Sequence, residues 1–559
     1  MSSSPQFPGS PIREAAELLG LEVSELHAIM MLRAAGHINL PLASCDLVKY
    51  PGRQVQAPLP SASAQSNWDG APSPPPDSPD NPPKLPFRTA NAVEPANAAA
   101  AGPQLAGPSR KWDLLPLTPR GRKRRAKTGD DHAVAAKPVR HGPLDAEARK
   151  SASLRRRTGV CVICHYKKTT CTPDEGSGGA SCSRCLSREL PCVGYRVTDV
   201  ALYREQSAPC HLFSKRWKSM DMIDITDWAD NDVRTIKISL AFLDAPFEVD
   251  VRKFVPAPGD SLEEKWVDKK GNLKKWPVPP YGIVCMARAA ESISYMMDRN
   301  VVNYMNSLIG GGTGDESHLL WQTYYAAFRH CSNAPTEGEK TLLCNTFRLW
   351  ASCRLTSHPD RIVGDEHLGM RQIDDPESPF EHMTPCPPVL GAQLECIMYS
   401  CFLRPLSDKV LRNLMELMEA RQPSTWYTIY LALFVLLHSC AMMTRRDMEY
   451  AKLVSLKGMF ANPQGIRKQM CGVITLLAHF HFAIKGAVPF RLALSGRSAE
   501  LATHGALLPD QVRLIVNSAR LVEKIRPTWR ELRSSESYGH DFYWISQMYD
   551  ENWKGDKMA

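Results

Sequence analysis

Six closely spaced cysteines constrain this chain more than any other feature of its sequence. They form two halves with the same pattern, C-x2-C-x6-C, separated by ten residues. Two thiolates separated by two residues at the start of a helical turn can face one metal ion, and Zn²⁺ takes four such ligands. The pattern therefore predicts a metal cluster, with the expected ligands Cys161, Cys164, Cys171, Cys182, Cys185 and Cys192.

The number of ligands indicates how many ions the cluster holds. Two separate tetrahedral zinc sites need eight ligand positions, and six thiolates fill them if two sulfurs, one from each half, bridge both ions. Cysteines that cluster by chance or pair in disulfides do not explain two halves in register. RING or LIM modules normally use more ligands, often with histidine, and only His165 lies within this stretch. We therefore expect two Zn²⁺ as cofactors.

At these residues the sequence resembles the fungal binuclear zinc cluster family of transcription regulators. The resemblance implies a fold with two short helices, each starting at a CxxC pair, and makes Cys161 and Cys182 the bridging ligands. It also implies that the first helix enters the major groove of double-stranded DNA, where Lys167 and Lys168 read a CGG-like triplet. The long C-terminal half is similar, more loosely, to the regulatory region of such proteins.

Positive charge around the cysteines supports an interaction with DNA. Two Zn²⁺ and six thiolates leave a net negative charge, which repels phosphate unless nearby cations outweigh it. Lysines commonly contact the acceptors of guanine in the major groove, whereas arginines beside them are expected to contact phosphates. A solvated helix surface is the alternative interpretation of the same residues. The candidate DNA-binding residues are Lys167, Lys168, Arg155, Arg156, Arg157, Arg184 and Arg188.

The stretch departs from the family pattern in three respects. Thr169 and Thr170 replace basic residues that often precede the third cysteine. Pro173 comes early in a glycine-rich loop, where the family usually has a proline shortly before the fourth cysteine. No sustained heptad repeat follows the cysteines, so dimerisation through a coiled coil is not supported and the oligomeric state stays open.

Composition divides the rest of the chain. A proline-rich and alanine-rich tract cannot bury enough apolar surface to offset its ordering entropy, so we expect it to be disordered. The basic run RGRKRRAK that follows this tract fits a nuclear import signal, formed by Arg122, Lys123, Arg124, Arg125 and Lys127. The predicted order is a short amphipathic helical segment (1–50), a disordered and basic linker (51–154), the zinc cluster domain (155–196), a connector (197–230) and a mainly helical regulatory domain (231–559).

The regulatory domain is expected to be mainly α-helical with a few strands. Two strands are predicted over residues 234–256, around a turn at Asp244-Ala245-Pro246. Thr336 and Glu339 form a candidate capping box for one helix. Further helices are predicted from residue 283 to 310, near 318–331 and 338–354, and near 389–403, 406–421, 424–450, 465–485 and 509–525, with Pro527 as a stop.

One segment, Trp426–Met443, is apolar enough to resemble a membrane span. Thr428, His438 and Ser439 interrupt it, and a helix buried within a large helical core gives the same pattern. We choose the buried helix over a single membrane span. The sequence also begins without a signal peptide pattern, and its scattered cysteines are typical of an intracellular protein.

These observations favour a nuclear, zinc-dependent, sequence-specific transcription regulator that is not an enzyme. Its expected partners are double-stranded DNA and, through the C-terminal domain, transcription machinery or regulators. His479 and His481 are interpreted as packed core residues, because residues two apart face different sides of a helix. The final DFYWISQMYDENW segment fits an activation segment or a packed helix equally well. The alternatives are a zinc-stapled protein adaptor, or a helical enzyme or ligand-binding domain with an accessory zinc module.

Overall fold

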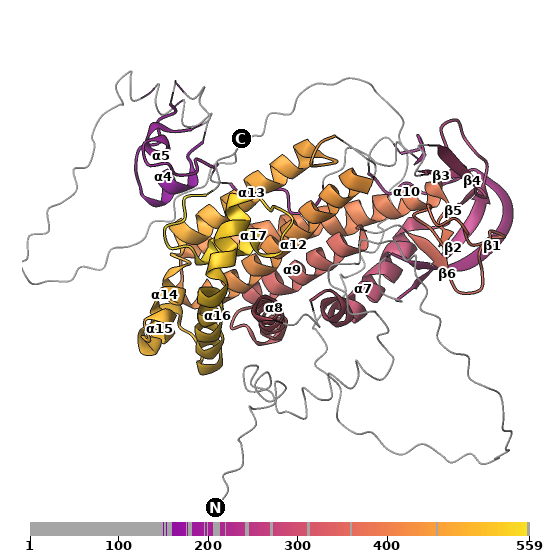
Figure 1. The fold of residues 1–559 in the computed structure, drawn as a ribbon. Helices are drawn as coiled ribbons and strands as arrows, with labels where there is room; N and C mark the ends of the chain where they lie inside the picture. The colour runs from indigo at the N-terminus through magenta and orange to yellow at the C-terminus, as the bar shows by residue number, and fades with distance from the viewer. Residues whose placement is uncertain are drawn as a thin grey trace, which may run out of the picture. The chain divides into compact units, whose positions relative to one another are not determined.

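The computed structural model describes the cysteine cluster, the connector and the regulatory domain (Figure 1). The described residues are Arg149, Ser153 and 159–555, except for 175, 177–180, 195, 198–199, 205–212, 218–219, 241–244, 269–271, 310–313, 358–359 and 454–456. The predicted N-terminal helices, the disordered linker, the import run and Arg155–Arg157 lie outside these residues.

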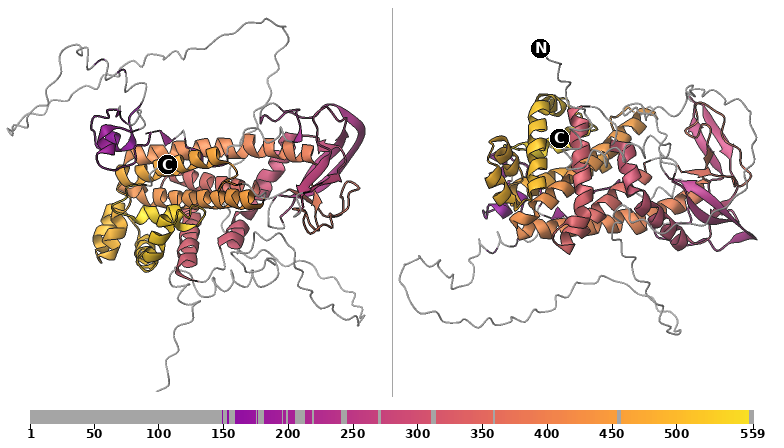
Figure 2. Two further views of the ribbon diagram at one scale, coloured as in Figure 1. Left: turned by 45° about the horizontal axis from the view of Figure 1, so that its top comes forward. Right: turned by 90° about the horizontal axis from the view of Figure 1, so that it is seen from below.

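A five-stranded antiparallel sheet lies at one end of the helical domain (Figures 1 and 2). Its central pair, β1 and β2, confirms the two strands predicted over 234–256, although β1 begins earlier. Strands β3 and β4 pair with each other as a separate two-stranded antiparallel sheet. In sheet order the strands are β5 (Tyr281–Ile283), β2 (Phe247–Phe254), β1 (Trp228–Ser239), β6 (Arg361–Val363) and β7 (Thr384–Pro385), and the separate pair is β3 (Glu263–Val267) with β4 (Leu273–Pro277).

The helices form the rest of the described chain, and most of them share one continuous core with the sheet, whereas α5 packs in the separate core of the cysteine cluster. They are α4 (Val162–Tyr166), α5 (Ser183–Leu186), α7 (Met286–Ile309), α8 (Asp315–Asn333), α9 (Glu337–Leu355), α10 (Pro388–Ile397), the π-helix η2 (Met398–Leu403), α11 (Arg404–Ala420), the 3-10 helix η3 (Pro423–Thr425), α12 (Trp426–Leu453), α13 (Pro463–Ala483), α14 (Val488–Leu494), α15 (Ser498–Gly505), α16 (Pro509–Ser534), α17 (Phe542–Ile545) and the 3-10 helix η4 (Ser546–Tyr549).

Helix α12 contains the segment that resembled a membrane span. Residues Pro423–Lys452 are long and apolar enough to cross a bilayer, but the apolar window is entirely buried within the structure. Helices α13 and α14 pass the same test only as a pair, and the pair is bent by 64°. The interpretation of α12 as a buried core helix is confirmed, because side chains on all its faces contact protein.

The prediction that Pro527 stops a helix is wrong. Helix α16 continues through Pro527 to Ser534. Proline removes one backbone hydrogen bond and crowds the preceding turn, yet tertiary contacts hold the last turns in place. Trp529 stacks on Phe542 and donates a hydrogen bond to a carboxylate oxygen of Glu316 at 3.0 Å. Packing against other elements therefore outweighs the local preference.

The capping residues of α9 behave only partly as predicted. The hydroxyl of Thr336 accepts a hydrogen bond from the backbone N–H of Glu339 at 3.3 Å, as an N-cap should. The Glu339 carboxylate accepts hydrogen bonds from the hydroxyls of Thr336 and Thr428. The side chain thus ties the start of α9 to α12, a contact between distant segments that the local sequence pattern does not contain.

The connector after the cysteines is built into the domain. Val197, Leu202 and Trp217 are buried in the same core as the helices. Gly472 on α13 permits the close approach, because a Cβ there would lie 2.5 Å from Cγ1 of Val200. A side chain at position 472 would therefore force the connector and the helix apart.

Candidate metal centre and nucleic-acid interface

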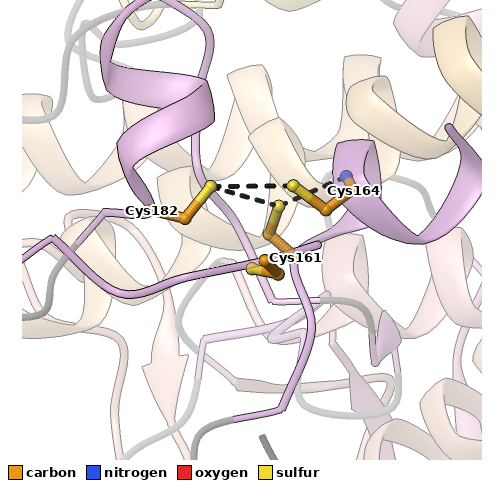
Figure 3. Close-up of side chains that lie close together, drawn as sticks. Cys161, Cys164 and Cys182 are labelled. Carbon is orange, nitrogen blue, oxygen red and sulfur yellow. Dashed lines mark hydrogen bonds between the residues drawn. The ribbon is translucent and has the colours of Figure 1, made fainter. Parts of the chain in front are cut away.

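The six predicted ligands lie together in the structure. Two groups of four thiols each have all sulfurs within 4.8 Å of one another, and either group could hold a metal ion. Cys161 and Cys182 belong to both groups, and Figure 3 shows them beside Cys164. The groups are Cys161, Cys164, Cys171 and Cys182, and Cys161, Cys182, Cys185 and Cys192.

The distances between the sulfurs fit a zinc ion. Four sulfurs at about 2.3 Å from one tetrahedral Zn²⁺ lie about 3.8 Å from each other. The sulfur of Cys182 lies 3.7 Å from that of Cys164 and 4.0 Å from that of Cys161 (Figure 3). The sulfurs of Cys161 and Cys185 are 3.7 Å apart. The donor set therefore has both the composition and the spacing that zinc requires.

The backbone of the two halves follows the same plan. Cys161 and Cys182 are the N-cap residues of α4 and α5, and each sulfur accepts a hydrogen bond from the N–H three residues on, at 3.4 Å. The N–H of Val162 donates to the carbonyl of Val193, and that of Ser183 donates to the carbonyl of Thr172. Each helix therefore starts against the other half, as expected for an internal duplication.

Both helices of the cluster also end alike. Lys168 and Glu189 follow α4 and α5 at corresponding positions, and each has a left-handed backbone, with φ of 52° and 53°. Sequence reasoning missed this feature. The equal spacing of the two CxxC pairs was the signal that could have revealed it.

The close packing of the thiols affects their protonation. Burial, followed by the neighbouring Cys161, raises the pKa of Cys164. Burial is also the main cause that raises the pKa of Cys171 to about 11. Zinc binds thiolates, so loading these ligands requires release of their protons, and the ion's charge offsets the repulsion between the sulfurs.

The basic side chains predicted to contact DNA differ in exposure. Lys167, Lys168 and Arg188 are exposed, and Arg184 is half-buried. In the first half of the cluster, Lys167 and Lys168 follow directly after the end of α4. In the other half, the corresponding positions hold Arg188 and Glu189, and the Glu189 carboxylate binds the ammonium of Lys554 at 3.1 Å.

One face of α4 is covered by the regulatory domain. Val162 and Tyr166 are buried and belong to the main core. The Tyr166 hydroxyl lies 2.9 Å from Nδ1 of His479 on α13, and the Arg421 guanidinium lies over the Tyr166 ring at 4.6 Å. The lysines at the end of α4 are outside this contact, since both are exposed.

The remaining candidate segments are parts of the core. His479 is buried, and Nε2 of His481 lies 2.9 Å from the carbonyl oxygen of Gln547, which confirms the prediction of two packed histidines. Phe542 and Trp544 in the C-terminal segment are also buried. That segment is therefore a packed helix in this structure.

Comparisons with known proteins identify the helical domain. A family profile described as KpeA transcription factor matches residues 204–548. Transcription factor kpeA of Aspergillus oryzae (strain ATCC 42149 / RIB 40) is 22% identical over 370 residues, which are 61% of this chain and 45% of that protein. The chain thus spans less than half the length of this curated relative. No solved structure matches it.

Both matches indicate that this chain is a fungal transcription factor. The chain belongs to the KpeA transcription factor family. The match to the family begins after the last cysteine of the cluster, so membership rests on the helical domain.

Proposed function

We propose that this transcription factor holds two zinc ions in its cysteine cluster and reads CGG-like triplets of double-stranded DNA through the major groove. The observation that carries the proposal is the pair of four-thiol groups that share Cys161 and Cys182. Two tetrahedral zinc ions need this sharing of ligands. Bound zinc would supply the cross-links that hold α4 and α5 in place.

The unequal charge of the two halves favours α4 as the helix that reads DNA. Lys167 and Lys168 add two exposed positive charges at its end. At the corresponding place after α5, Glu189 carries a negative charge that pairs with Lys554 and adds no free cation. A lysine at the groove edge can donate to O6 and N7 of guanine, whereas a carboxylate beside the phosphate backbone is repelled.

The arginines serve a different purpose in this proposal. Arg184 and Arg188, with Arg155–Arg157 before the cluster, contact phosphates and fix the orientation of the domain. Phosphate contacts add affinity that depends on salt but carry no sequence information.

The regulatory domain would connect this DNA-binding module to transcription machinery or to other regulators. The basic run Arg122–Arg125 with Lys127 would direct the protein to the nucleus. Binding as a monomer, or as a dimer through the C-terminal domain, agrees with the lack of a heptad repeat after the cysteines.

The test is an unbiased DNA selection with the full chain in the presence of zinc. We expect enrichment of sites that contain a CGG-like triplet, and loss of this enrichment when a chelator removes the metal. A chain that binds zinc but enriches no sequence would contradict the proposal and favour a zinc-stapled adaptor that binds protein. A chain with Cys471→Ser, a change at an exposed thiol outside the cluster, is the control and should select the same sites.

A further inference from the structure

A cavity of about 260 Å³ lies between the connector and the regulatory domain, and no cysteine of the cluster lines it. It is lined by the connector, the ends of β1 and α9, the segment around β6 and β7, and helices α10 and η2, and it is partly open to solvent. A cavity of about 150 Å³ already accommodates a benzene molecule, so this space accepts a somewhat larger organic group. Much of the wall is apolar and buried, with contributions from Leu240, Leu355, Leu394, Met398 and Leu403.

Three carboxylates interrupt this apolar wall. They belong to Glu264 on β3, Asp360 before β6 and Glu395 on α10. Within the described part of the chain, Asp360 and Glu395 have no side-chain hydrogen bond or ion pair, and Oε2 of Glu395 is inaccessible to solvent. The three side chains are half-buried, but an oxygen that is itself buried without a partner, as Oε2 of Glu395 is, is costly, which makes such groups typical of sites where a ligand supplies the partner.

The electrostatics indicate what kind of partner is missing. Burial raises the pKa of Asp360 to about 8, and the charges of Glu395 and Glu264 raise it further towards that value. Burial also raises the pKa of Glu395 to about 7. Arg204 lines the cavity too, and its charge lowers the pKa of Glu395, but Asp447 lies 3.7 Å from the same guanidinium, so one shared cation faces three carboxyl groups. The cavity therefore favours a cation.

A single metal ion does not fit this arrangement. Among the described residues, the groups of acidic, histidine or cysteine side chains with ligand atoms within 4.8 Å of one another consist of cysteines. The three carboxylates are therefore too far apart to surround one ion. Apolar walls between them suit an organic cation better than a hydrated metal.

The backbone beside the cavity is specialised as well. Met398, Tyr399 and Leu403 line it from the π-helix η2, which joins α10 to α11. Pro405 cannot donate a hydrogen bond to the residue four positions back, and the N–H of Arg404 donates to the carbonyl of Tyr399, five positions back. Such π-helical turns occur frequently at functional sites.

We propose that this cavity is a binding site for a small organic amine, with its ammonium group between Asp360 and Glu395 and its apolar body against Leu394 and Met398. The site goes beyond DNA recognition and does not depend on it. It gives the regulatory domain a means to sense a metabolite of this chemical class. A neutral or anionic molecule of the same shape lacks the charge that the carboxylates require.

The first experiment measures the melting temperature of the zinc-loaded full chain with three probes of similar shape. The probes are 2-phenylethylamine, 2-phenylethanol and 3-phenylpropanoate, each at millimolar concentration. We expect the amine to raise the melting temperature by about 2–5 °C, and the alcohol and the acid to leave it unchanged. Equal effects of amine and alcohol, or no effect of the amine, would overturn the proposal.

Two variants locate the site. Glu395→Gln keeps the size of the side chain and removes its charge, so the amine should bind at least tenfold more weakly. Gly391→Leu should fill the cavity, since the nearest atom to a Cβ at this helical position is Oδ2 of Asp360 at 4.0 Å. The control is Glu449→Gln, because this carboxylate on α12 lies outside the cavity and 3.9 Å from Arg446. If Gly391→Leu is folded and still responds to the amine, the proposal is wrong.

Discussion

The hydroxyl of Tyr166, at the end of the first cluster helix, lies 2.9 Å from Nδ1 of His479 in the core of the regulatory domain. The two residues are 313 positions apart in the sequence. Their rings also meet edge to face at 5.4 Å between centroids. The contact joins the cysteine cluster to the helical domain whose sequence matches the family profile.

This contact leads to a stability prediction. Tyr166→Phe removes the hydroxyl and leaves a buried histidine nitrogen without that partner, so we expect a loss of about 1–3 kcal/mol in the free energy of unfolding. The measurement is denaturant unfolding of the zinc-loaded full chain. Tyr450→Phe, at an exposed position of α12, should change the free energy by less than about 0.5 kcal/mol. Equal effects of the two variants would show that the hydrogen bond does not stabilise the fold.

Metal stoichiometry tests the shared ligands. The full chain should contain two zinc ions, and Cys161→Ser or Cys182→Ser should disturb both because these thiols belong to both groups. Cys171→Ser should mainly disturb one. Elemental analysis by mass spectrometry gives the zinc content per chain. A content of one ion in the wild-type chain would exclude the binuclear arrangement.

Lysine and arginine variants separate base reading from phosphate binding. Lys167→Ala or Lys168→Ala should weaken binding to the preferred site by about 1–3 kcal/mol, with a smaller loss on a scrambled duplex. Arg188→Ala should weaken binding to all sequences alike and lower the slope of log affinity against log salt by about one. Titrations at several salt concentrations measure both effects. Lys457→Ala, at an exposed position outside the cluster, is the control.

If the lysine and arginine variants behave identically, the α4 lysines do not read bases. The wild-type chain must also bind the preferred duplex more tightly than the scrambled one, because otherwise the variants have no specificity to lose. A lack of discrimination counts against sequence-specific recognition itself.

The carboxylates of the cavity make stability depend on pH. The folded pKa of Glu395 is raised to about 7, so the folded state binds this proton more tightly than the unfolded state and loses stability as pH rises through 7. Asp360, with a pKa raised to about 8, contributes in the same direction. We expect Glu395→Gln to be about 1–2 kcal/mol more stable than wild type at pH 8.5 and nearly equal at pH 5, with partial exposure of the side chain allowed for. Unfolding curves at the two pH values provide the test, and a difference that is the same at both would contradict the assignment.

The import prediction concerns residues outside the described part of the chain. Changing Arg122, Lys123, Arg124 and Arg125 together to alanine should shift a fluorescently tagged protein from the nucleus towards the cytoplasm. Microscopy of living cells measures the ratio of the two signals. Unchanged nuclear accumulation would leave the basic run with a phosphate-binding role at most.

The sequence by itself determined the features that depend on spacing along the chain. Two CxxC pairs in register predicted the thiol groups, because ligand spacing is a local property of helical turns. The nearly continuous apolar composition of Trp426–Met443, interrupted by a few polar residues, predicted a buried helix, and α12 confirms it. The short strands β6 and β7 and helices α14 and α15 were missed, since so few residues carry little periodic signal.

Only the tertiary structure decided the features that join distant segments. Packing of Trp529 on Phe542 keeps Pro527 inside α16, although local preference predicts a stop. The cavity gathers Glu264, Asp360 and Glu395 from three separate elements, and the pairing of Tyr166 with His479 joins the cluster to the core. Burial and contacts between residues far apart in the chain stabilise these arrangements. A local sequence pattern does not contain such contacts.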